Sequence, residues 1–252
     1  MPKNINHQQI QLPIIGYLRS PLCQKFGLPR QPNLVNLAGV IELIPPFDNP
    51  DAFVGLQEFS HIWLIWQFHQ NKTAANLSFR PQVRPPRLGG NAKLGVFATR
   101  SMYRPANIGL SVVLLQHIEQ NNHSVRLHVV GADLVDGTPI IDIKPYIVYS
   151  DSLPHAISGF ASDKPALKKL VVSETAQQNF ANLKKQRLLT ENDIATISAL
   201  IAQDPRPAYR QTEINSKFTL QYQQVDVCFC MLDNNALQIV SAVKINNKTN
   251  NA

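Results

Sequence analysis

The chain has 252 residues, of which 44% are hydrophobic and 16% charged, a composition that excludes a disordered chain and predicts a folded protein with one large domain or two modest ones. Its three cysteines match no disulfide framework or zinc-binding spacing, and no apolar stretch is long enough to cross a bilayer or to act as a targeting signal, so we expect a cytoplasmic protein with free thiols and no metal site. The net charge of +7 resides in residues 1–104, which hold eleven Lys/Arg against four Asp/Glu, whereas residues 105–252 hold thirteen of each.

The N-terminal part of the chain is predicted to form strands separated by a long loop. Residues 10–19 and 34–44 are rich in Ile, Leu and Val, as strands are, whereas residues 21–32 between them contain three prolines and a glycine. Residues 51–58 are compatible with one or two helical turns. Residues 61–69 form an apolar run with both tryptophans, which predicts a strand buried on both faces.

Further short strands are expected before residue 150, with no helices between them. They lie at 94–99, 108–118, 124–131 and 139–143, and a loop dense in proline and arginine precedes them at 71–91. Short strands joined by Gly/Pro turns favour a barrel or a sandwich over a parallel sheet with crossover helices.

Residues 80–104 carry six basic side chains and no acidic one. A solvated surface usually mixes the two signs, so this run favours binding to a phosphate polyanion such as nucleic acid, with a merely basic surface loop as the alternative. The segment from Arg84 to Arg87 is stiff because two prolines restrict its backbone, whereas Gly89 and Gly90 permit a close backbone approach.

The composition changes after about residue 150, and the remainder is predicted to be a small α+β module. Helices are expected at 175–187 and at 190–203, the second with Thr190 at its N-terminus, and strands at 218–231 and 236–243.

Residues 204–210 (DPRPAYR) cannot lie inside a helix because two prolines bracket an arginine. We expect them to present Arg206, Tyr209 and Arg210 on a stiff arm that grips unpaired RNA by stacking and by phosphate contact. The alternative is a loop that packs the module against the N-terminal domain.

Common nucleotide-binding and hydrolase motifs are absent from the sequence. No Gly-x-Gly-x-x-Gly occurs, and Val96 and Phe97 stand where a phosphate loop that began at Gly90 would need Lys and Ser/Thr. Neither His-Glu-x-x-His nor Gly-x-Ser-x-Gly is present. A Rossmann cofactor site and a Walker NTPase therefore have no support.

Polar side chains follow several predicted strands at their ends. The turn 133–139 contains two aspartates, whose carboxylates could accept from a ligand or merely bond their own backbone. Arg100 directly follows the predicted strand 94–99, and its guanidinium suits a carboxylate ligand, with a surface arginine as the alternative. His69 and Gln70 close the apolar strand, where a histidine is more often a core group than a ligand contact.

Eight short strings, in order along nearly the whole chain, resemble the TsaA-like family, and within it the bacterial tRNA methyltransferases that act on threonylcarbamoyl-adenosine at position 37. The strings are KFGLPRQP at 25–32, FSH at 59–61, FHQ at 68–70, RPPRLGGN at 84–91, GVFATRS at 95–101, DLVDGTP at 133–139, DIKPY at 142–146 and DPRPAYR at 204–210. One segment departs from the family pattern Arg-Pro-Asn-Pro-Ile-Gly, since residues 104–109 read RPANIG and the asparagine is displaced to Asn107.

The resemblance implies an α+β protein with a mostly antiparallel β-barrel domain at 8–150 and a smaller α+β domain at 165–246 that contacts tRNA. It implies a homodimer that transfers a methyl group from S-adenosylmethionine, bound without a Rossmann fold, to the exocyclic amine of the modified adenosine in threonine tRNA. Matching the strings places the cofactor contacts at Pro29, Arg30, Gln31, His69, Gln70, Arg100, Leu110, Asp133, Asp136, Gly137 and Thr138.

The acceptor nitrogen in such a reaction is a weak nucleophile, so a side chain must take or share its proton. Tyr103 and Asp136 are the candidates, and the residues do not decide between them. The anticodon-loop phosphates and unpaired bases would be positioned by side chains from both predicted domains: Arg30, Arg84, Arg87, Arg104, Arg206, Tyr209 and Arg210.

Two other functions remain open at this stage. A non-catalytic RNA-binding β-barrel would explain the basic run but would show no saturable binding of S-adenosylmethionine. An S-adenosylmethionine enzyme with a small-molecule substrate would explain the ligand-like strings, but it would bind tRNA negligibly rather than with a steep salt dependence.

Overall fold

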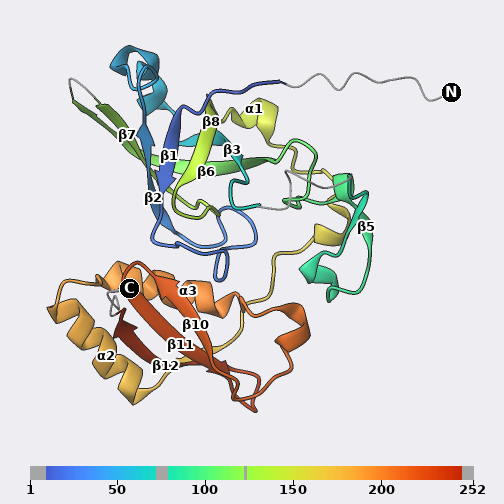
Figure 1. The fold of residues 1–252 in the computed structure, drawn as a ribbon, viewed down its shortest axis with the longest axis vertical. Coiled ribbons are helices and arrows are strands. Elements are labelled where there is room, and N and C mark those ends of the chain that lie inside the picture. Colours follow the sequence, from blue (N-terminus) through green and yellow to red (C-terminus); the bar gives the residue numbers. More distant parts are fainter. Residues whose placement is uncertain (1–9, 72–78, 122–123, 246–252) are drawn as a thin grey trace, which may run out of the picture.

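The computed structural model describes residues 10–71, 79–121 and 124–245, and its N-terminal part is a closed barrel. Round the barrel the strands follow the order β1-β2-β7-β6-β3-β8, and every neighbouring pair is antiparallel. The strands are β1 (Gly16–Arg19), β2 (Ala38–Leu43), β3 (His61–Gln67), β6 (Ile108–Asn121), β7 (Ser124–Val130) and β8 (Thr138–Pro145), as Figure 1 shows. The antiparallel barrel expected for this part of the chain is confirmed.

Only one face of each barrel strand supplies the core. In β3, Ile62, Leu64 and Trp66 are buried, whereas Trp63 and Ile65 between them are only half-buried. The expectation of a strand buried on both faces is therefore wrong. The sheet closes on itself, so alternate side chains point outward, and the Trp63 indole N–H donates to the Asp151 carboxylate at 2.9 Å.

The strand expected after residue 93 is much shorter than predicted. β5 (Leu94–Gly95) pairs only with β4 (Gln82–Val83), outside the barrel, and the chain then turns into a 3-10 helix at Val96–Ala98. Thr99 closes that turn, because its backbone N–H and its hydroxyl both donate to the Val96 carbonyl, at 3.2 and 2.9 Å. This turn ends the β4–β5 pairing, because the Val96 carbonyl bonds within the turn and not to a neighbouring strand.

Short helical turns occupy other connections of the N-terminal part. They are the 3-10 helices Pro50–Phe53, Leu56–Glu58, Pro86–Leu88 and Gly159–Ala161, and α1 (Val148–Asp151). The first two confirm the helical turns expected at 51–58. In the ranges that the structure describes, no helix is both long and apolar enough to cross a membrane.

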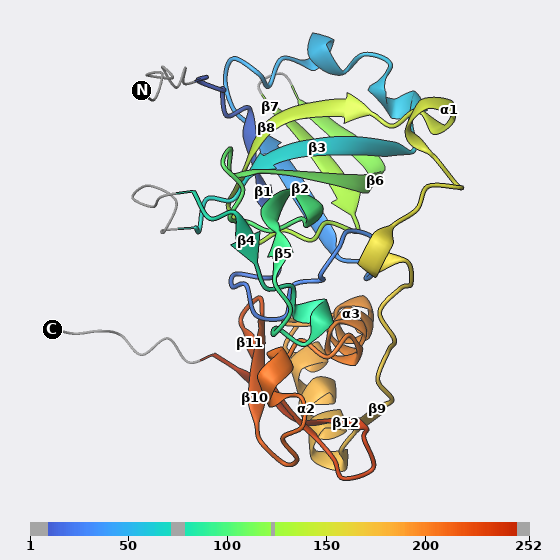
Figure 2. The ribbon, with the colours of Figure 1, turned by 90° about the vertical axis from the view of Figure 1, so that its right-hand side faces the viewer.

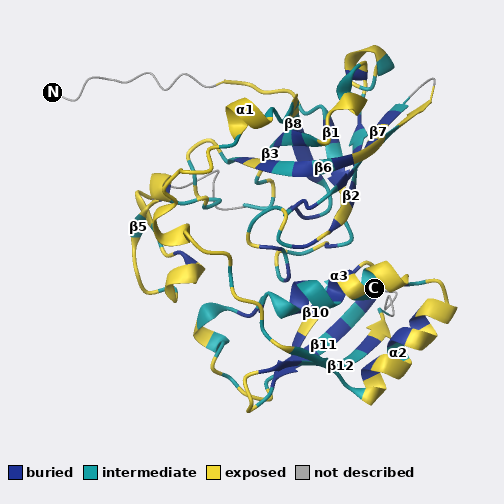
Figure 3. Ribbon diagram, turned by 180° about the vertical axis from the view of Figure 1, so that it is seen from behind, coloured by how far each residue is buried: buried dark blue, intermediate teal, exposed yellow. Residues whose placement is uncertain are grey.

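The C-terminal part is a four-stranded sheet with two helices. The sheet has the order β10-β11-β12-β9, and both predicted helices are confirmed (Figures 1 and 3). The elements are β9 (Leu170–Val172), α2 (Glu174–Lys185), α3 (Glu191–Ala202), β10 (Phe218–Tyr222), β11 (Val225–Met231) and β12 (Leu237–Lys244). β9, which was not predicted, pairs in parallel with β12.

The start of α3 has the cap that its sequence predicts. The Thr190 hydroxyl accepts from the backbone N–H of Asp193 at 3.1 Å, and the Asp193 carboxylate accepts from the backbone N–H of Thr190 at 2.8 Å. This reciprocal pairing satisfies two N–H groups that a helix start otherwise leaves without partners.

The loop between β1 and β2, residues 20–37, joins the two parts of the molecule. Its buried residues Leu22, Val35 and Leu37 belong to the hydrophobic core of the C-terminal part, not to that of the barrel. Phe26 of the same loop stacks on Phe218 at 6.4 Å between ring centroids. The division into domains at 8–150 and 165–246 stays a prediction. The loop 20–37 belongs to the first of these ranges in sequence, but its buried side chains pack in the core of the second.

Candidate functional site

The strand register brings three connections to one end of the barrel. Arg19 at the end of β1 pairs with Val40 near the start of β2, and Ala38 pairs with Val130 at the end of β7. At the same end, the last residue of β3 pairs with the first of β6, and β8 begins beside β1. The connections 20–37, 68–107 and 131–137 therefore all start from this end, which we call the barrel mouth (Figure 2).

A polar chain runs from the barrel core to the mouth. The Trp66 indole N–H donates to the Ser111 hydroxyl at 3.1 Å, and that hydroxyl donates to the Asp133 carboxylate at 2.7 Å. Burial raises the pKa of Asp133 above its usual range, although the Ser111 hydrogen bond and the positive charge of Arg100 oppose the shift. The mouth thus holds a partly buried carboxylate that is hydrogen-bonded on one oxygen.

Hydrogen bonds link two of these connections, 20–37 and 68–107, at the mouth. Arg100 donates to the Gln31 side-chain oxygen at 2.7 Å, which joins the segments 96–107 and 20–37. The Lys25 ammonium donates to the Gln70 carbonyl at 3.0 Å and lies 3.8 Å from the Met102 sulfur. These contacts hold the exposed guanidinium of Arg100 near the partly buried carboxylate of Asp133.

The turn between β7 and β8 is tied to the loop 20–37 through Asp136. Asp136 accepts from the backbone N–H of Ser20 at 3.0 Å and, through its own N–H, donates to the Leu22 carbonyl at 2.8 Å. Gly137 has a φ of 74°, which favours glycine. One oxygen of the Asp136 carboxylate therefore binds the backbone of the loop 20–37 and stabilises it, whether or not the other oxygen contacts a ligand.

Thr138, another expected cofactor contact, lies at the start of β8 and stays a prediction. Its side chain is buried, at 1% exposure, and its hydroxyl donates to the Val135 carbonyl at 2.7 Å. The hydroxyl therefore closes the turn that leads into β8. Leu110 lies on the outer barrel face and is 52% exposed, next to the inward-facing Ser111.

Several predicted residues do come together at the mouth. Gln31, Gln70, Arg100 and Asp133 are connected as described, and the pKa of His69 is lowered by burial and by the charge of Lys25. Arg100 was predicted to follow a strand directly, and this is wrong. It comes after the 3-10 turn, whose backbone sets its position.

Two other predicted contacts lie beside this cluster. Pro29 is buried, and Arg30 donates from its guanidinium to the Asp204 carbonyl at 3.3 Å, which ties the loop 20–37 to the C-terminal part. Tyr103 is 39% exposed, with the Arg80 guanidinium 5.3 Å from its ring centroid.

The predicted RNA-contacting arginines differ in their surroundings. Arg84 is exposed. Arg87 is also exposed and donates to the Asp163 carbonyl. Arg104 is half-buried and donates to the Thr99 carbonyl. Arg84 is accordingly the member of this group best placed to meet a phosphate.

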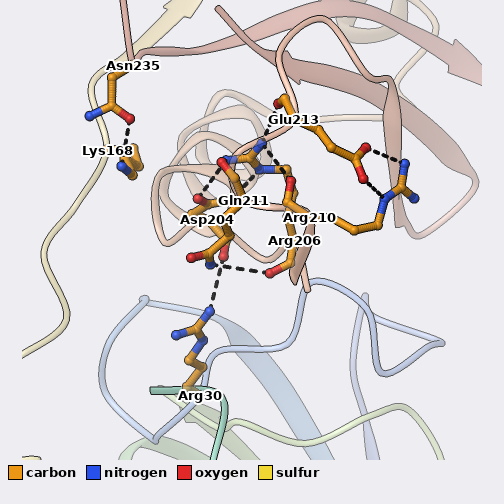
Figure 4. A network of polar contacts seen from close by, with 8 residues as sticks. All are labelled: Arg30, Lys168, Asp204, Arg206, Arg210, Gln211, Glu213 and Asn235. Carbon is orange, nitrogen blue, oxygen red and sulfur yellow. Dashed lines mark hydrogen bonds and ion pairs between the residues drawn. The ribbon is translucent and has the colours of Figure 1, made fainter. Parts of the chain in front are cut away.

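Arg206 corrects the prediction of an RNA-contacting arm. Its side chain is fully buried, and its guanidinium forms a two-pronged ion pair with Asp204 at 2.7 and 2.9 Å. It also donates to the carbonyls of Gln211 and Glu213, at 3.0 and 3.1 Å (Figure 4). A residue with this many internal partners organises the loop and is not available to RNA.

The remainder of that loop is partly open to solvent. Tyr209 is 82% exposed. Arg210 forms two hydrogen bonds of 2.7 Å with Glu213 and lies 4.5 Å from the Phe218 ring centroid. The pKa of Glu213 falls to about 2 because Arg210 and Ser216 both hydrogen-bond its carboxylate. Tyr209 is therefore the exposed member of the three residues proposed for RNA contact.

Sequence analysis gave no role to Ser111 or Lys25, although both help to build the mouth. Ser111 interrupts an otherwise apolar inward face of β6, between Gly109 and Val113, and a polar residue at such a position is a usable signal because a buried hydroxyl needs a partner. In the part of the chain that the structure covers, no three His, Cys, Asp or Glu side chains are grouped as metal ligands.

Comparison with known proteins gives consistent matches along the chain. The family described as the tRNA-methyltransferase O N-terminal domain matches residues 17–152, and the TrmO C-terminal domain matches residues 165–245. The tRNA (adenine(37)-N6)-methyltransferase of Escherichia coli (strain K12) is 47% identical over 81% of this chain and 85% of its own. A putative S-adenosylmethionine-dependent methyltransferase of Pseudomonas aeruginosa, RcsF, is 45% identical over 84% of this chain and 89% of its own.

Solved structures agree with these sequence matches. A crystal structure of TrmO from Pseudomonas aeruginosa superposes with a TM-score of 0.77 at 33% sequence identity, covering 96% of this chain and 100% of the other. A second TrmO crystal structure gives a TM-score of 0.75 at 34% identity, with 94% of this chain and 100% of the other covered.

Proposed function

The chain belongs to the tRNA-methyltransferase O family, and on that premise we propose that the barrel mouth is where it binds its cofactor and presents it to tRNA. The enzyme is an S-adenosylmethionine-dependent methyltransferase that acts on N6 of adenine 37 in tRNA. The observation that carries the proposed site is the convergence of Gln31, Arg100 and Asp133 from three separate connections.

The polar groups of the mouth fit the chemistry of S-adenosylmethionine. This cofactor offers a carboxylate, an ammonium group and ribose hydroxyls, and the mouth offers an exposed guanidinium at Arg100 and carboxylates at Asp133 and Asp136. When bound, S-adenosylmethionine supplies an electrophilic methyl group on its sulfonium. The chain therefore needs to align the acceptor and to exclude water rather than to activate the methyl group.

We assign the carboxylate of the cofactor to Arg100, which Gln31 holds in place from the opposite loop. Asp136 keeps one oxygen on the Ser20 backbone and takes an amine or a hydroxyl with the other. Asp133 lies beside them and accepts a hydrogen bond from the Ser111 hydroxyl of the barrel core. Backbone groups of Pro29, His69, Gln70 and Gly137 complete the proposed contacts.

The acceptor nitrogen gives up a proton as it gains the methyl group, so a side chain at the mouth accepts or shares that proton. Tyr103 and Asp136 remain the two candidates. Tyr103→Phe and Asp136→Asn, compared by the pH dependence of kcat, separate them, because only loss of the proton acceptor removes an ionisation from the profile.

The finer substrate assignment rests on the family resemblance. We propose that the adenosine carries a threonylcarbamoyl group, that threonine tRNA is the substrate, and that the enzyme works as a cytoplasmic homodimer. Apolar side chains on 148–157 are strongly exposed, for instance Tyr149 at 90% and Ile157 at 98%, and they give a second copy a surface to cover. Sedimentation at micromolar concentration tests the dimer.

The decisive experiment for the function uses purified protein, labelled S-adenosylmethionine and threonine tRNA prepared with and without the threonylcarbamoyl group. We expect transfer only to the modified tRNA. Transfer to both would correct the proposed substrate, and transfer to neither, with cofactor bound, would contradict the activity. Family membership disfavours the non-catalytic RNA-binding barrel and the small-molecule enzyme.

A further inference from the structure

A pair of exposed phenylalanines lies in the basic segment between β3 and β6. Phe97 is 68% exposed and Phe79 is 56% exposed, yet their rings stack, with centroids 5.9 Å apart and planes inclined by 29°. An aromatic pair usually withdraws from water, because each ring contributes most when it is buried. The exposure of both rings therefore needs a cause other than packing of this chain.

The backbone fixes Phe97 in this exposed position. Its neighbour Val96 is buried at 1% exposure, and the backbone N–H of Val96 donates to the Pro81 carbonyl at 2.9 Å. On the other side, the Thr99 hydroxyl donates back to the Val96 carbonyl. The 3-10 turn is thus anchored at both ends, and Phe97 is presented at its outer side without the entropy of a mobile loop.

Arginines accompany the aromatic rings. The Arg104 guanidinium lies 5.9 Å from the Phe97 ring centroid, and the Arg80 guanidinium lies 5.3 Å from that of Tyr103. No acidic residue occurs between residues 79 and 104. Aromatic rings interleaved with cations, without acids, provide the chemistry that binds unpaired nucleotides: bases stack on rings, and phosphates meet guanidinium groups.

The position of the pair suits an RNA that already occupies the barrel mouth. Phe97 lies in the same short turn that leads to Arg100, the residue assigned to the cofactor. A base that stacks on Phe97 therefore belongs to the same unpaired loop as the methylated base, but it is a different nucleotide.

We propose that Phe79 and Phe97 form a stacking platform for an unpaired base of the tRNA anticodon loop that flanks the methylated adenosine. This inference rests on the proposed tRNA substrate and adds to it a site that holds the loop in register by contact with a neighbouring base. Stacking acts on the π face, which all bases share, so the platform fixes the position of the loop without reading its sequence.

The test compares Phe97→Ala, Phe97→Leu and Phe97→Trp with Phe47→Ala, an exposed phenylalanine in the loop after β2, at the opposite end of the barrel. The probes are an RNA hairpin with the anticodon loop of threonine tRNA and a fully paired RNA duplex of the same length. We expect Phe97→Ala and Phe97→Leu to weaken hairpin binding by about 5- to 140-fold. Phe97→Trp should bind like the natural protein, with its added fluorescence quenched by the hairpin, and Phe47→Ala should be unchanged.

Two further readouts separate stacking from other causes. The salt slope of hairpin binding should stay the same in Phe97→Ala, because stacking releases no counterions, and duplex binding should not change. Hairpin binding by Phe97→Leu at the natural level would overturn the proposal, and so would a shift of Phe97→Ala from dimer to monomer, which would assign the platform to a second copy. If the natural protein binds the hairpin through Phe97 but transfers no methyl group, the proposed function fails while the platform stands.

Discussion

Arg206 offers the sharpest test of the loop that joins α3 to β10. The guanidinium is fully buried against Asp204, whose side chain is 6% exposed, and it also satisfies two backbone carbonyls. Arg206→Met keeps much of the side-chain volume but leaves the Asp204 carboxylate buried without its cation. Breaking a buried pair in this way costs about 3–5 kcal/mol, and the two carbonyls lose their donors as well.

The expected result is a large loss of stability. For a chain of this size, about 1 kcal/mol corresponds to roughly 2–4 °C in Tm, so Arg206→Met should melt on the order of 6–20 °C below the natural protein. Thermal melts followed by circular dichroism, together with urea unfolding, measure the change. Tyr209→Ala is the matched control, because that side chain is 82% exposed and should change the free energy of unfolding by less than about 0.5 kcal/mol.

A second variant isolates the stranded charge. Asp204 has a φ of 50°, a conformation that Asn tolerates, so Asp204→Asn can be combined with Arg206→Met without added backbone strain. The double variant should be more stable than Arg206→Met alone, because no buried charge remains unpaired. A natural melting temperature for Arg206→Met would refute the buried ion pair and would return Arg206 to the RNA-contacting arm.

The remaining predictions concern the mouth and its basic border. Arg100→Ala and Asp136→Ala should each weaken S-adenosylmethionine binding by about 1.5–3 kcal/mol, roughly tenfold to over a hundredfold, and unchanged calorimetric affinity in both would remove them from the cofactor site. The pKa of Asp133 is raised by burial, so cofactor affinity that depends on its carboxylate should fall as the pH drops through a value above the usual aspartate range. Asp133→Asn should abolish this pH dependence. An affinity profile of Asp133→Asn identical to the natural one would contradict a role of the Asp133 carboxylate in binding. Replacing Arg84 and Arg87 together by Ala should flatten the salt slope of tRNA binding by about one to two counterions, with cofactor affinity unchanged, and an unaltered slope would show that neither arginine meets phosphate.

Much of the barrel could be predicted because alternation is a local property of the sequence. β7 repeats buried and less buried residues through Val125, Leu127 and Val129. The turn that follows has Asp136 and Gly137 directly before β8 begins. The helices α2 and α3 could be predicted from the sequence as well, since the Thr190 cap and the apolar spacing are both short-range signals.

Other features depend on contacts between distant segments, and the sequence alone does not specify them. β9 has three residues and gains its order from β12, far along the chain. The loop 20–37 reads as a plain proline-rich connection, but Phe26 and Leu22 pack into the C-terminal core. Arg206 carries the same local pattern whether it faces solvent or a buried Asp204, so only the fold decides between the two.

The candidate site shows the same division. Its members could be nominated because each follows a strand or a turn, but their convergence required the register of the closed barrel. The sequence also does not specify the partner of the Thr138 hydroxyl, because a hydroxyl in a tight turn can bond a ligand or its own backbone; in the structure it donates to the Val135 carbonyl.

The central claim, that the barrel mouth delivers a methyl group to adenosine 37, is tested most directly by mapping the transferred label. Threonine tRNA is incubated with labelled S-adenosylmethionine and either the natural protein or Arg100→Ala, and the labelled nucleoside is located after nuclease digestion. We predict label on N6 of adenosine 37 alone, with Arg100→Ala losing transfer at low cofactor concentration and recovering much of it at high concentration. Label at another position, or equal transfer by the natural protein and Arg100→Ala at low cofactor concentration, would contradict the account.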